Sequence, residues 1–163
     1  MTTATLTTTA KRSRSEPVQL ATFYVADMCL ALDIALIQEI IRDVKVTRVP
    51  HAPPQVRGVI NLRGEVTTVV DLRQVLGLSP LDTTSDTQTL IVRSQGESIG
   101  LIVDRVGDIC AVEGGSIVPP PPNVDRVDGS FFHGVCQRKT EIILVLDLEQ
   151  ALAPSPPSRR PSE

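Results

Sequence analysis

Residues 58–76, GVINLRGEVTTVVDLRQVL, return 76 positions later as residues 134–152, GVCQRKTEIILVLDLEQAL. The two segments align without a gap over 19 positions, and they share Gly-Val at the start, Glu in the middle, and Asp-Leu, Gln and Leu near the end. Ordered matches of this kind indicate an internal duplication. A duplicated fold offers two comparable faces, which suits joining two partners better than it suits a single catalytic pocket.

Each copy predicts the same local structure. In the first copy, residues 56–62 and 66–70 have the composition of a β-hairpin, and Asp71 stands where it would cap a single helical turn. In the second copy, residues 131–146 predict the matching hairpin and Asp147 the matching cap. The repeated Asp is therefore explained by one architectural role better than by paired carboxylate chemistry.

One helix is predicted ahead of the first copy. The isoleucines between residues 34 and 41 recur at helical spacing, and Asp33 precedes them in the position of an N-cap. The sequence therefore predicts a short helix over residues 34–43, with one apolar stripe.

The rest of the ordered sequence predicts strands. Residues 20–32 and 89–103 each form a hairpin pattern, and residues 108–112 form a further strand. About ten short strands with little helix indicate an all-β fold, either barrels or a sandwich. We expect two small closed barrels of about five strands each, with the second unit starting at Gln88, because closure removes exposed strand edges.

The ends of the chain have a different composition. Residues 1–17 are rich in Thr and Ser, and residues 153–163 are rich in Pro, Ser and Arg. Both segments are too poor in apolar side chains to form a core, so we expect two disordered tails.

Composition limits the possible partners. The chain has 163 residues, of which 41% are apolar, but only one Tyr, three Phe and no Trp, so its core must be built from Val, Ile, Leu and Ala. A net charge of −3 and few aromatic rings argue against nucleic-acid binding. No apolar run reaches the length of a membrane span, so we expect no direct membrane insertion. Three Cys without paired spacing indicate reduced, buried thiols in a cytosolic protein.

A catalytic or cofactor site is not evident. His51 lies in a Pro-flanked loop and His133 on a predicted strand, and neither has a Ser or Cys nearby in a nucleophile context. The sequence contains no paired Cys or His at metal-ligand spacing and no phosphate-binding loop. We therefore expect no catalytic residue, no metal site and no cofactor.

The sequence also resembles a known family. Residues 56–64, VRGVINLRG, followed by VVDLR at residues 69–73, resemble the signature of the CheW family of bacterial chemotaxis adaptors. Weaker similarity extends upstream through residues 47–50, TRVP, and downstream through residues 100–106, GLIVDRV. Together the resemblance covers about residues 19–152.

The resemblance implies a fold and a function. It implies a CheW-like domain over residues 18–152, made of two intertwined five-stranded SH3-like barrels with an apolar groove between them and a few short helices. It also implies a non-enzymatic adaptor that couples the helical cytoplasmic tip of methyl-accepting chemoreceptors to the regulatory domain of a CheA-type histidine kinase. Such a protein would be cytoplasmic and recruited to receptor arrays at the inner membrane.

Six residues are expected to form the partner-binding site. The resemblance places Glu39 and Arg63 on the receptor-facing side, and we predict that they form an ion pair that bridges the predicted helix and the hairpin. For Arg63 a solvated charge is an equally good interpretation, and for Ile37 core packing is the alternative. The full predicted set for receptor or kinase binding is Ile37, Glu39, Gly58, Asn61, Leu62 and Arg63.

Two other hypotheses remain open at this point. The chain could be a barrel-type protein interaction module outside chemotaxis that binds Pro-rich or other peptide ligands. It could also be an enzyme whose site the sequence does not reveal.

Overall fold

The computed structural model describes residues 17–42, 44–78, 87–124, 127–139 and 141–153. Strands predominate in this part of the chain, in two sheets of five strands and one pair of two-residue strands. The prediction of an all-β fold with about ten strands is therefore confirmed. The two predicted tails lie outside the described residues, apart from Pro17 and Ala153 at their inner ends.

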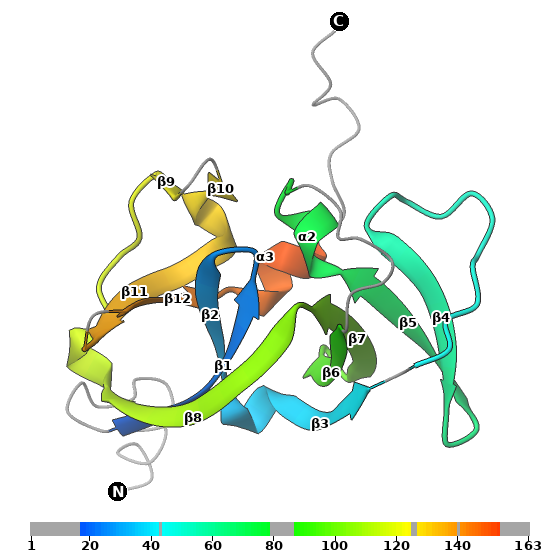
Figure 1. Cartoon of the computed structure of the whole chain (residues 1–163), viewed down its shortest axis with the longest axis horizontal. Helices are drawn as coiled ribbons and strands as arrows, with labels where there is room; N and C mark the ends of the chain where they lie inside the picture. The colour runs from blue at the N-terminus through cyan, green and yellow to red at the C-terminus, as the bar shows by residue number, and fades with distance from the viewer. Residues whose placement is uncertain (1–16, 43, 79–86, 125–126, 140, 154–163) are drawn as a thin grey trace, which may run out of the picture.

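The first barrel combines strands from both ends of the chain. Its sheet has the order β11-β12-β2-β1-β8, and the strands fill the left half of Figure 1. Their bounds are β1 Pro17–Val25, β2 Met28–Asp33, β8 Arg105–Glu113, β11 Phe132–Arg138 and β12 Glu141–Leu146.

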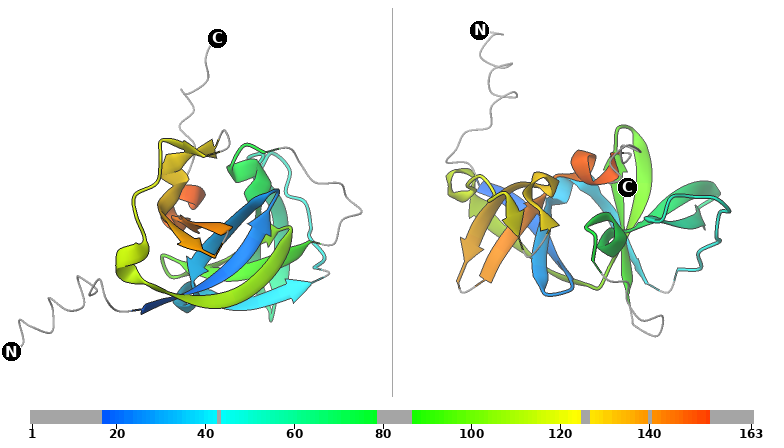
Figure 2. Two further views of the ribbon diagram at one scale, coloured as in Figure 1. Left: turned by 60° about the vertical axis from the view of Figure 1, so that its left-hand side comes forward. Right: turned by 90° about the horizontal axis from the view of Figure 1, so that it is seen from above.

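The second barrel is built from the middle of the chain. Its sheet has the order β3-β6-β7-β5-β4, and the view from above in Figure 2 shows it beside the first barrel. Its strands are β3 Ile37–Arg42, β4 Val56–Leu62, β5 Glu65–Asp71, β6 Gln88–Ser94 and β7 Glu97–Val103. The short pair β9 Asn123–Val124 and β10 Val127–Asp128 lies outside both sheets.

The sequence predicted that the second unit starts at Gln88. The structure does not divide there. Hairpin β1–β2 pairs with β8 and β12 from the second half of the chain, whereas hairpin β6–β7 pairs with β3 and β5 from the first half. The two halves have thus exchanged their N-terminal hairpins. Hydrophobic periodicity predicts where strands lie along the chain but carries no information on which strands pair.

The predicted helix over residues 34–43 is wrong. Asp33 does cap a helical turn, since its carboxylate accepts a hydrogen bond from the N–H of Ala35, but this 3-10 turn ends after Ile34–Leu36. The chain then continues as β3. The pairing of β3 with β6 shifts register between Ile37 and Glu39. Such a bulge inserts one extra residue, so the isoleucines on one side of the strand acquire a spacing of three, which imitates a helix.

The duplicated segment folds as predicted. Hairpins β4–β5 and β11–β12 are each followed by a short helix, α2 Leu72–Val75 and α3 Leu148–Leu152. Asp71 accepts a hydrogen bond from the N–H of Arg73, and Asp147 from that of Gln150. Both carboxylates therefore cap helices, which confirms the architectural interpretation of the repeated Asp.

The repeated glycine closes each barrel. Beyond β3, Thr47 exchanges two backbone hydrogen bonds of 2.8 Å with Val59, and beyond β8, Val118 exchanges bonds of 2.9 and 2.7 Å with Val135. A Cβ on Gly58 would lie 2.2 Å from the carbonyl oxygen of Thr47, and one on Gly134 would lie 2.7 Å from that of Val118. Only glycine allows this approach, which joins the two outer strands of each sheet.

Three apolar clusters hold the molecule together. The largest lies between the barrels and includes Phe23, Leu30, Leu72, Leu101 and Leu146. Two smaller clusters fill the barrels themselves, around Leu20 and Ile143 in the first and around Val69 and Ile91 in the second. Because the shared cluster is the largest, the two barrels stabilise each other and form one folding unit.

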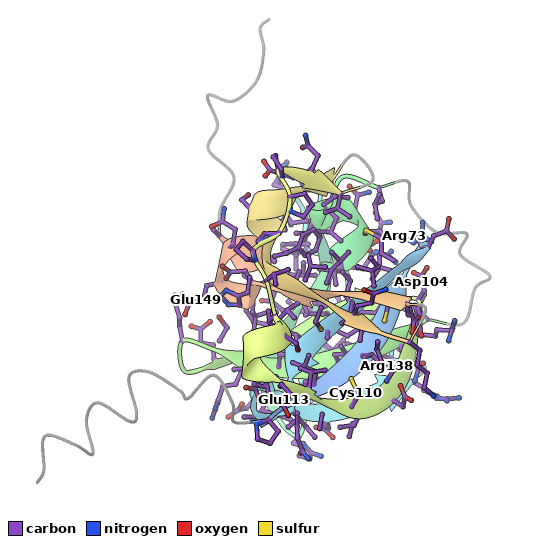
Figure 3. All side chains as sticks on the ribbon, turned by 90° about the vertical axis from the view of Figure 1, so that its left-hand side faces the viewer. Arg73, Asp104, Cys110, Glu113, Arg138 and Glu149 are labelled. Carbon is purple, nitrogen blue, oxygen red and sulfur yellow. The ribbon has the colours of Figure 1, made fainter. Side chains whose placement is uncertain are left out.

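A half-buried ion pair also links the barrels. The guanidinium of Arg73 in α2 donates to both carboxylate oxygens of Asp104, at 3.0 and 2.7 Å, and the N–H of Ala26 in the β1–β2 turn donates to the same carboxylate at 2.8 Å. Figure 3 shows Arg73 and Asp104 side by side. Asp104 therefore joins a helix of the second barrel to a turn of the first.

Candidate functional site

An apolar groove of about 410 Å³ lies between the two barrels. Strands β3 and β8 form its two sides, and β1 and β6 contribute to its floor. Its apolar lining residues include Ala21, Phe23, Ile37, Ile40, Leu90, Val106 and Ile109. This is the groove that the family resemblance implied.

The rims of the groove carry exposed isoleucines. Ile40 on β3 is 46% exposed and Ile109 on β8 is 56% exposed. Large aliphatic side chains left in water beside an apolar cavity are typical of a protein interaction surface rather than of a solvated face. The arrangement therefore suits an apolar helix face lying across both rims.

The predicted ion pair between Glu39 and Arg63 is present. The two guanidinium nitrogens of Arg63 donate to the two carboxylate oxygens of Glu39 at 2.6 and 2.9 Å. These hydrogen bonds lower the pKa of Glu39 below its ordinary value. Glu39 lies on β3 rather than on a helix, so the pair joins one outer strand of the second barrel to the tip of the β4–β5 hairpin.

A second, larger hollow of about 940 Å³ lies on the other side of this pair. Leu62, Arg63, Glu65 and Val66 of the β4–β5 hairpin line it together with residues of β7. Val66 is 76% exposed, the largest value among the exposed hydrophobic residues described. Glu39 lines both this hollow and the groove, so it marks the border between two surfaces.

The six predicted site residues are therefore not one cluster. Ile37 lines the groove, Leu62 and Arg63 line the larger hollow, and Glu39 lines both. The remaining two have structural explanations. Gly58 closes the barrel, and the side-chain oxygen of Asn61 accepts a hydrogen bond from the N–H of Gly64 in the hairpin turn.

The sequence did not point to the β8 side of the groove. Val106 and Ile109 belong to a strand whose other residues alternate between exposed and half-buried positions, so they carry no sequence signal of their own. The signal that could have found them is structural. Strand β8 pairs with β1 in the first barrel as β3 pairs with β6 in the second. In this comparison Val106 corresponds to Ile37, and Ile109 corresponds to Ile40.

A polar network joins strands β1, β8, β11 and β12 of the first barrel. The hydroxyl of Tyr24 donates to Glu141 at 2.8 Å, and Arg138 lies between the carboxylates of Glu141 and Asp108, at 3.5 and 3.4 Å. Thr22 donates to the backbone carbonyl of Asp108 at 2.7 Å. The hydrogen bond to Glu141, together with burial, raises the pKa of Tyr24 to about 12.

The three cysteines are free and belong to the same barrel. Cys29 and Cys136 are buried, as predicted, whereas Cys110 is only half-buried. Burial raises the pKa of Cys29 to about 11 and also raises the pKa of Cys136. The two buried thiols are therefore protonated at neutral pH and are poor nucleophiles.

His133 has one carboxylate neighbour among the described residues, and that carboxylate has a structural role. His133 is 65% exposed and its closest carboxylate, from Asp147, is 3.6 Å away and already caps α3. Within the described ranges, no group of three or more His, Cys, Asp or Glu side chains could hold a metal ion. In the same part of the chain, no helix combines the length and hydrophobicity needed to span a bilayer.

Two interlocked barrels that enclose an apolar groove, with exposed aliphatic rims and a second exposed surface beside it, define a protein-binding scaffold. The CheW-like domain family matches residues 19–154. The chain is 32% identical to the chemotaxis protein CheW of Rhizobium meliloti over 144 residues, which is 88% of this chain and 93% of that protein. It is 29% identical to the chemotaxis protein CheW of Helicobacter pylori over 142 residues, 87% of this chain and 86% of that protein.

A solved structure agrees with this comparison. The scaffolding protein TtCheW from Thermoanaerobacter tengcongensis superposes with a TM-score of 0.76 at 32% identity, over 81% of this chain and 90% of that one. The chain therefore belongs to the CheW-like family of chemotaxis adaptors. The alternative of a peptide-binding barrel module outside chemotaxis finds no support in these comparisons.

Proposed function

We propose that this protein couples methyl-accepting chemoreceptors to a CheA-type histidine kinase without catalysing a reaction of its own. The observation that carries the proposal is the apolar groove between the barrels, whose rims expose Ile40 and Ile109. The protein would then hold two partners at a fixed distance and orientation. The apolar core shared by the two barrels favours this function, because it fixes the barrels relative to each other.

The receptor partner would dock in the groove. Chemoreceptor tips are helical hairpins, and an amphipathic helix binds by placing its apolar face in a groove with a polar rim. Ile37 supplies apolar lining, while Glu39, paired with Arg63, supplies the polar rim. The ion pair also fixes the hairpin tip against β3, so it would maintain the shape of this side of the groove.

The kinase regulatory domain would use the surface beside the groove. Leu62 and Val66 of the β4–β5 hairpin line the larger hollow next to the groove, and Val66 is largely exposed. Two surfaces that meet at Glu39 allow both partners to be bound at once. In this arrangement the protein acts in the cytoplasm and is recruited to receptor arrays at the inner membrane.

Co-sedimentation tests the proposal. Membranes carrying a chemoreceptor are mixed with the purified protein and with a CheA-type kinase, and the pellet is analysed for each component. We expect the protein to pellet with receptor membranes and to increase the amount of kinase that pellets. If kinase recovery is the same with and without the protein, the coupling function is wrong.

A further inference from the structure

The groove is built from two copies of the same local structure. In the second barrel, Ile37 of β3 pairs with Val92 and Ile40 with Leu90, and a register shift separates the two pairs. In the first barrel, Val106 of β8 pairs with Phe23 and Ile109 with Ala21, again across a register shift. Each residue of one side therefore has a counterpart exactly 69 positions away on the other. The lining pairs are Ile37 and Val106, Gln38 and Gly107, Glu39 and Asp108, Ile40 and Ile109, and Ala21 and Leu90.

The two copies are related by an approximate two-fold rotation. The hairpin exchange is reciprocal, because β1–β2 pairs with strands of the second half while β6–β7 pairs with strands of the first. Reciprocal contacts of this kind characterise an isologous, two-fold arrangement. A perfectly symmetric groove would bind a helix equally well in either direction, since the rotation that exchanges the two sides also reverses the helix.

The groove departs from symmetry in the size of its side chains. The floor has Ala21 next to β8 but the larger Leu90 next to β3. The bulge has Gly107 on one side and Gln38 on the other, and the Gln38 amide accepts a hydrogen bond of 2.7 Å from Ser98. The β8 side is therefore deeper at its floor, because Ala21 is smaller than Leu90, and its bulge also carries the smaller residue, Gly107.

The space at Gly107 cannot be filled without moving a fixed side chain. A Cβ there would lie 2.5 Å from the hydroxyl oxygen of Thr22. Thr22 is fully buried and its hydroxyl donates to the carbonyl of Asp108 at 2.7 Å. Thr22 therefore keeps position 107 free of a larger side chain, so the bulge on the β8 side of the groove stays small.

The two carboxylates beside the groove also differ. Glu39 makes two short hydrogen bonds to Arg63, and only 28% of its side chain is exposed. Asp108 has a longer contact of 3.4 Å with Arg138, and 71% of its side chain is exposed. A basic residue of a partner can therefore reach Asp108 more readily than Glu39.

We infer that the groove binds a helical partner in one direction only. A large apolar side chain such as Leu, Met or Phe occupies the deeper half, beside Ala21 and Gly107, and a Lys or Arg of the partner lies near it, close to Asp108. This inference rests on the proposed function, and it specifies the partner's side chains and polarity at the same groove.

A labelled receptor fragment tests the direction. The full-length protein carries isotope-labelled Ile methyl groups, so Ile40 and Ile109 report on opposite rims. The probe is a soluble hairpin-tip fragment of a methyl-accepting chemoreceptor, with a nitroxide on its N-terminal helix or, separately, on its C-terminal helix. We expect one label to broaden mainly one rim methyl and the other label mainly the opposite one. Equal broadening of both methyls by each label would overturn the inference and leave the groove site intact. If neither methyl broadens, the groove is not the receptor site, and both the proposed function of the groove and this inference fail.

Two variants test the chemistry of the deeper half. Ala21→Leu fills the deeper half. It is expected to weaken the affinity for the fragment at least about tenfold, which is the usual effect of a poorly fitting apolar side chain in a pocket. Ala111→Leu, at an exposed position of β8 outside the groove, should leave affinity unchanged. Asp108→Asn should reduce both the affinity and its salt dependence, whereas Glu113→Gln at the end of β8 should not. A folded Ala21→Leu protein with unchanged affinity would contradict the assignment of the large side chain. An unchanged salt dependence in Asp108→Asn would contradict the basic partner residue.

Discussion

Replacing Gly58 with Ala should open the second barrel. The backbone of Gly58 has a φ of +151°, a region that residues with a Cβ rarely adopt, and the added Cβ would meet the carbonyl oxygen of Thr47 at 2.2 Å. A backbone atom cannot rotate away as a flexible side chain can. The two hydrogen bonds between Thr47 and Val59 must therefore break for the substitution to be accommodated.

The size of the effect follows from these two contributions. Two backbone hydrogen bonds contribute about 1 kcal/mol each to the net free energy of unfolding. The unfavourable φ costs a further 1–3 kcal/mol, roughly. Gly58→Ala should thus lower the free energy of unfolding by about 3–5 kcal/mol, a large part of the stability of a typical domain.

Urea unfolding of matched variants tests this estimate. Gly64→Ala is the control, because Gly64 also has a positive φ, +86°, but a Cβ there meets nothing within 4 Å. It should cost only about 1–2 kcal/mol, the penalty for the backbone conformation. Gly134→Ala, whose Cβ would approach Val118 in the first barrel, should fall between the two. If Gly58→Ala and Gly64→Ala differ by less than about 1 kcal/mol at equal m-values, the closure of the barrel by Gly58 is refuted.

Three further predictions concern charged and ionisable groups. In an absorbance titration, Tyr24, the single tyrosine of the chain, should ionise near pH 12, and Glu141→Gln should move its midpoint down; a wild-type midpoint near 10 would contradict the hydrogen bond. Burial alone would raise the pKa of Asp104, but its hydrogen bonds to the α2 guanidinium and to a backbone N–H lower it overall. The ionised Asp104 therefore stabilises the fold above about pH 4, the ordinary pKa of Asp, and this stabilisation is lost as the pH falls further. In Asp104→Asn, the unfolding temperature should consequently fall less steeply with decreasing pH than in the wild type. An equally steep fall in both proteins would contradict this. Glu39→Arg and Arg63→Glu should each weaken receptor binding, and the double variant with both substitutions should restore it. Additive losses in the double variant would show that the pair does not act as a unit.

Local features of the fold followed from the sequence. Gly and Asp at fixed positions of the repeat predicted the hairpins and the caps of α2 and α3, because turns and helix starts are decided by one or two residues. The Glu39–Arg63 pair was expected from the family resemblance and is present. These features depend on short stretches of chain or on a motif specific to the family.

The features that sequence reasoning missed depend on strand pairing. The bulge near Gln38 gave β3 a helix-like spacing of isoleucines, and tertiary pairing with β6 decided the outcome. Only the family resemblance implied intertwined barrels. The pattern of strands did not show the exchange of hairpins, because β1–β2 and β6–β7 occupy equivalent places in the fold without clear sequence identity. For the same reason Ile109 was not expected in the groove, although it is the counterpart of Ile40.

Kinase activity in a reconstituted array tests the central claim most directly. Receptor-dependent autophosphorylation of a CheA-type kinase is measured with wild-type protein, with Ile40→Asp and with Ile142→Asp. Ile142 is 54% exposed on β12, comparable to the 46% of Ile40, but it lies outside the groove. We expect the wild type and Ile142→Asp to couple receptor to kinase and Ile40→Asp to fail while remaining folded. Equal coupling by all three proteins would contradict the groove as the receptor site, and no effect of the wild type would contradict the adaptor function itself.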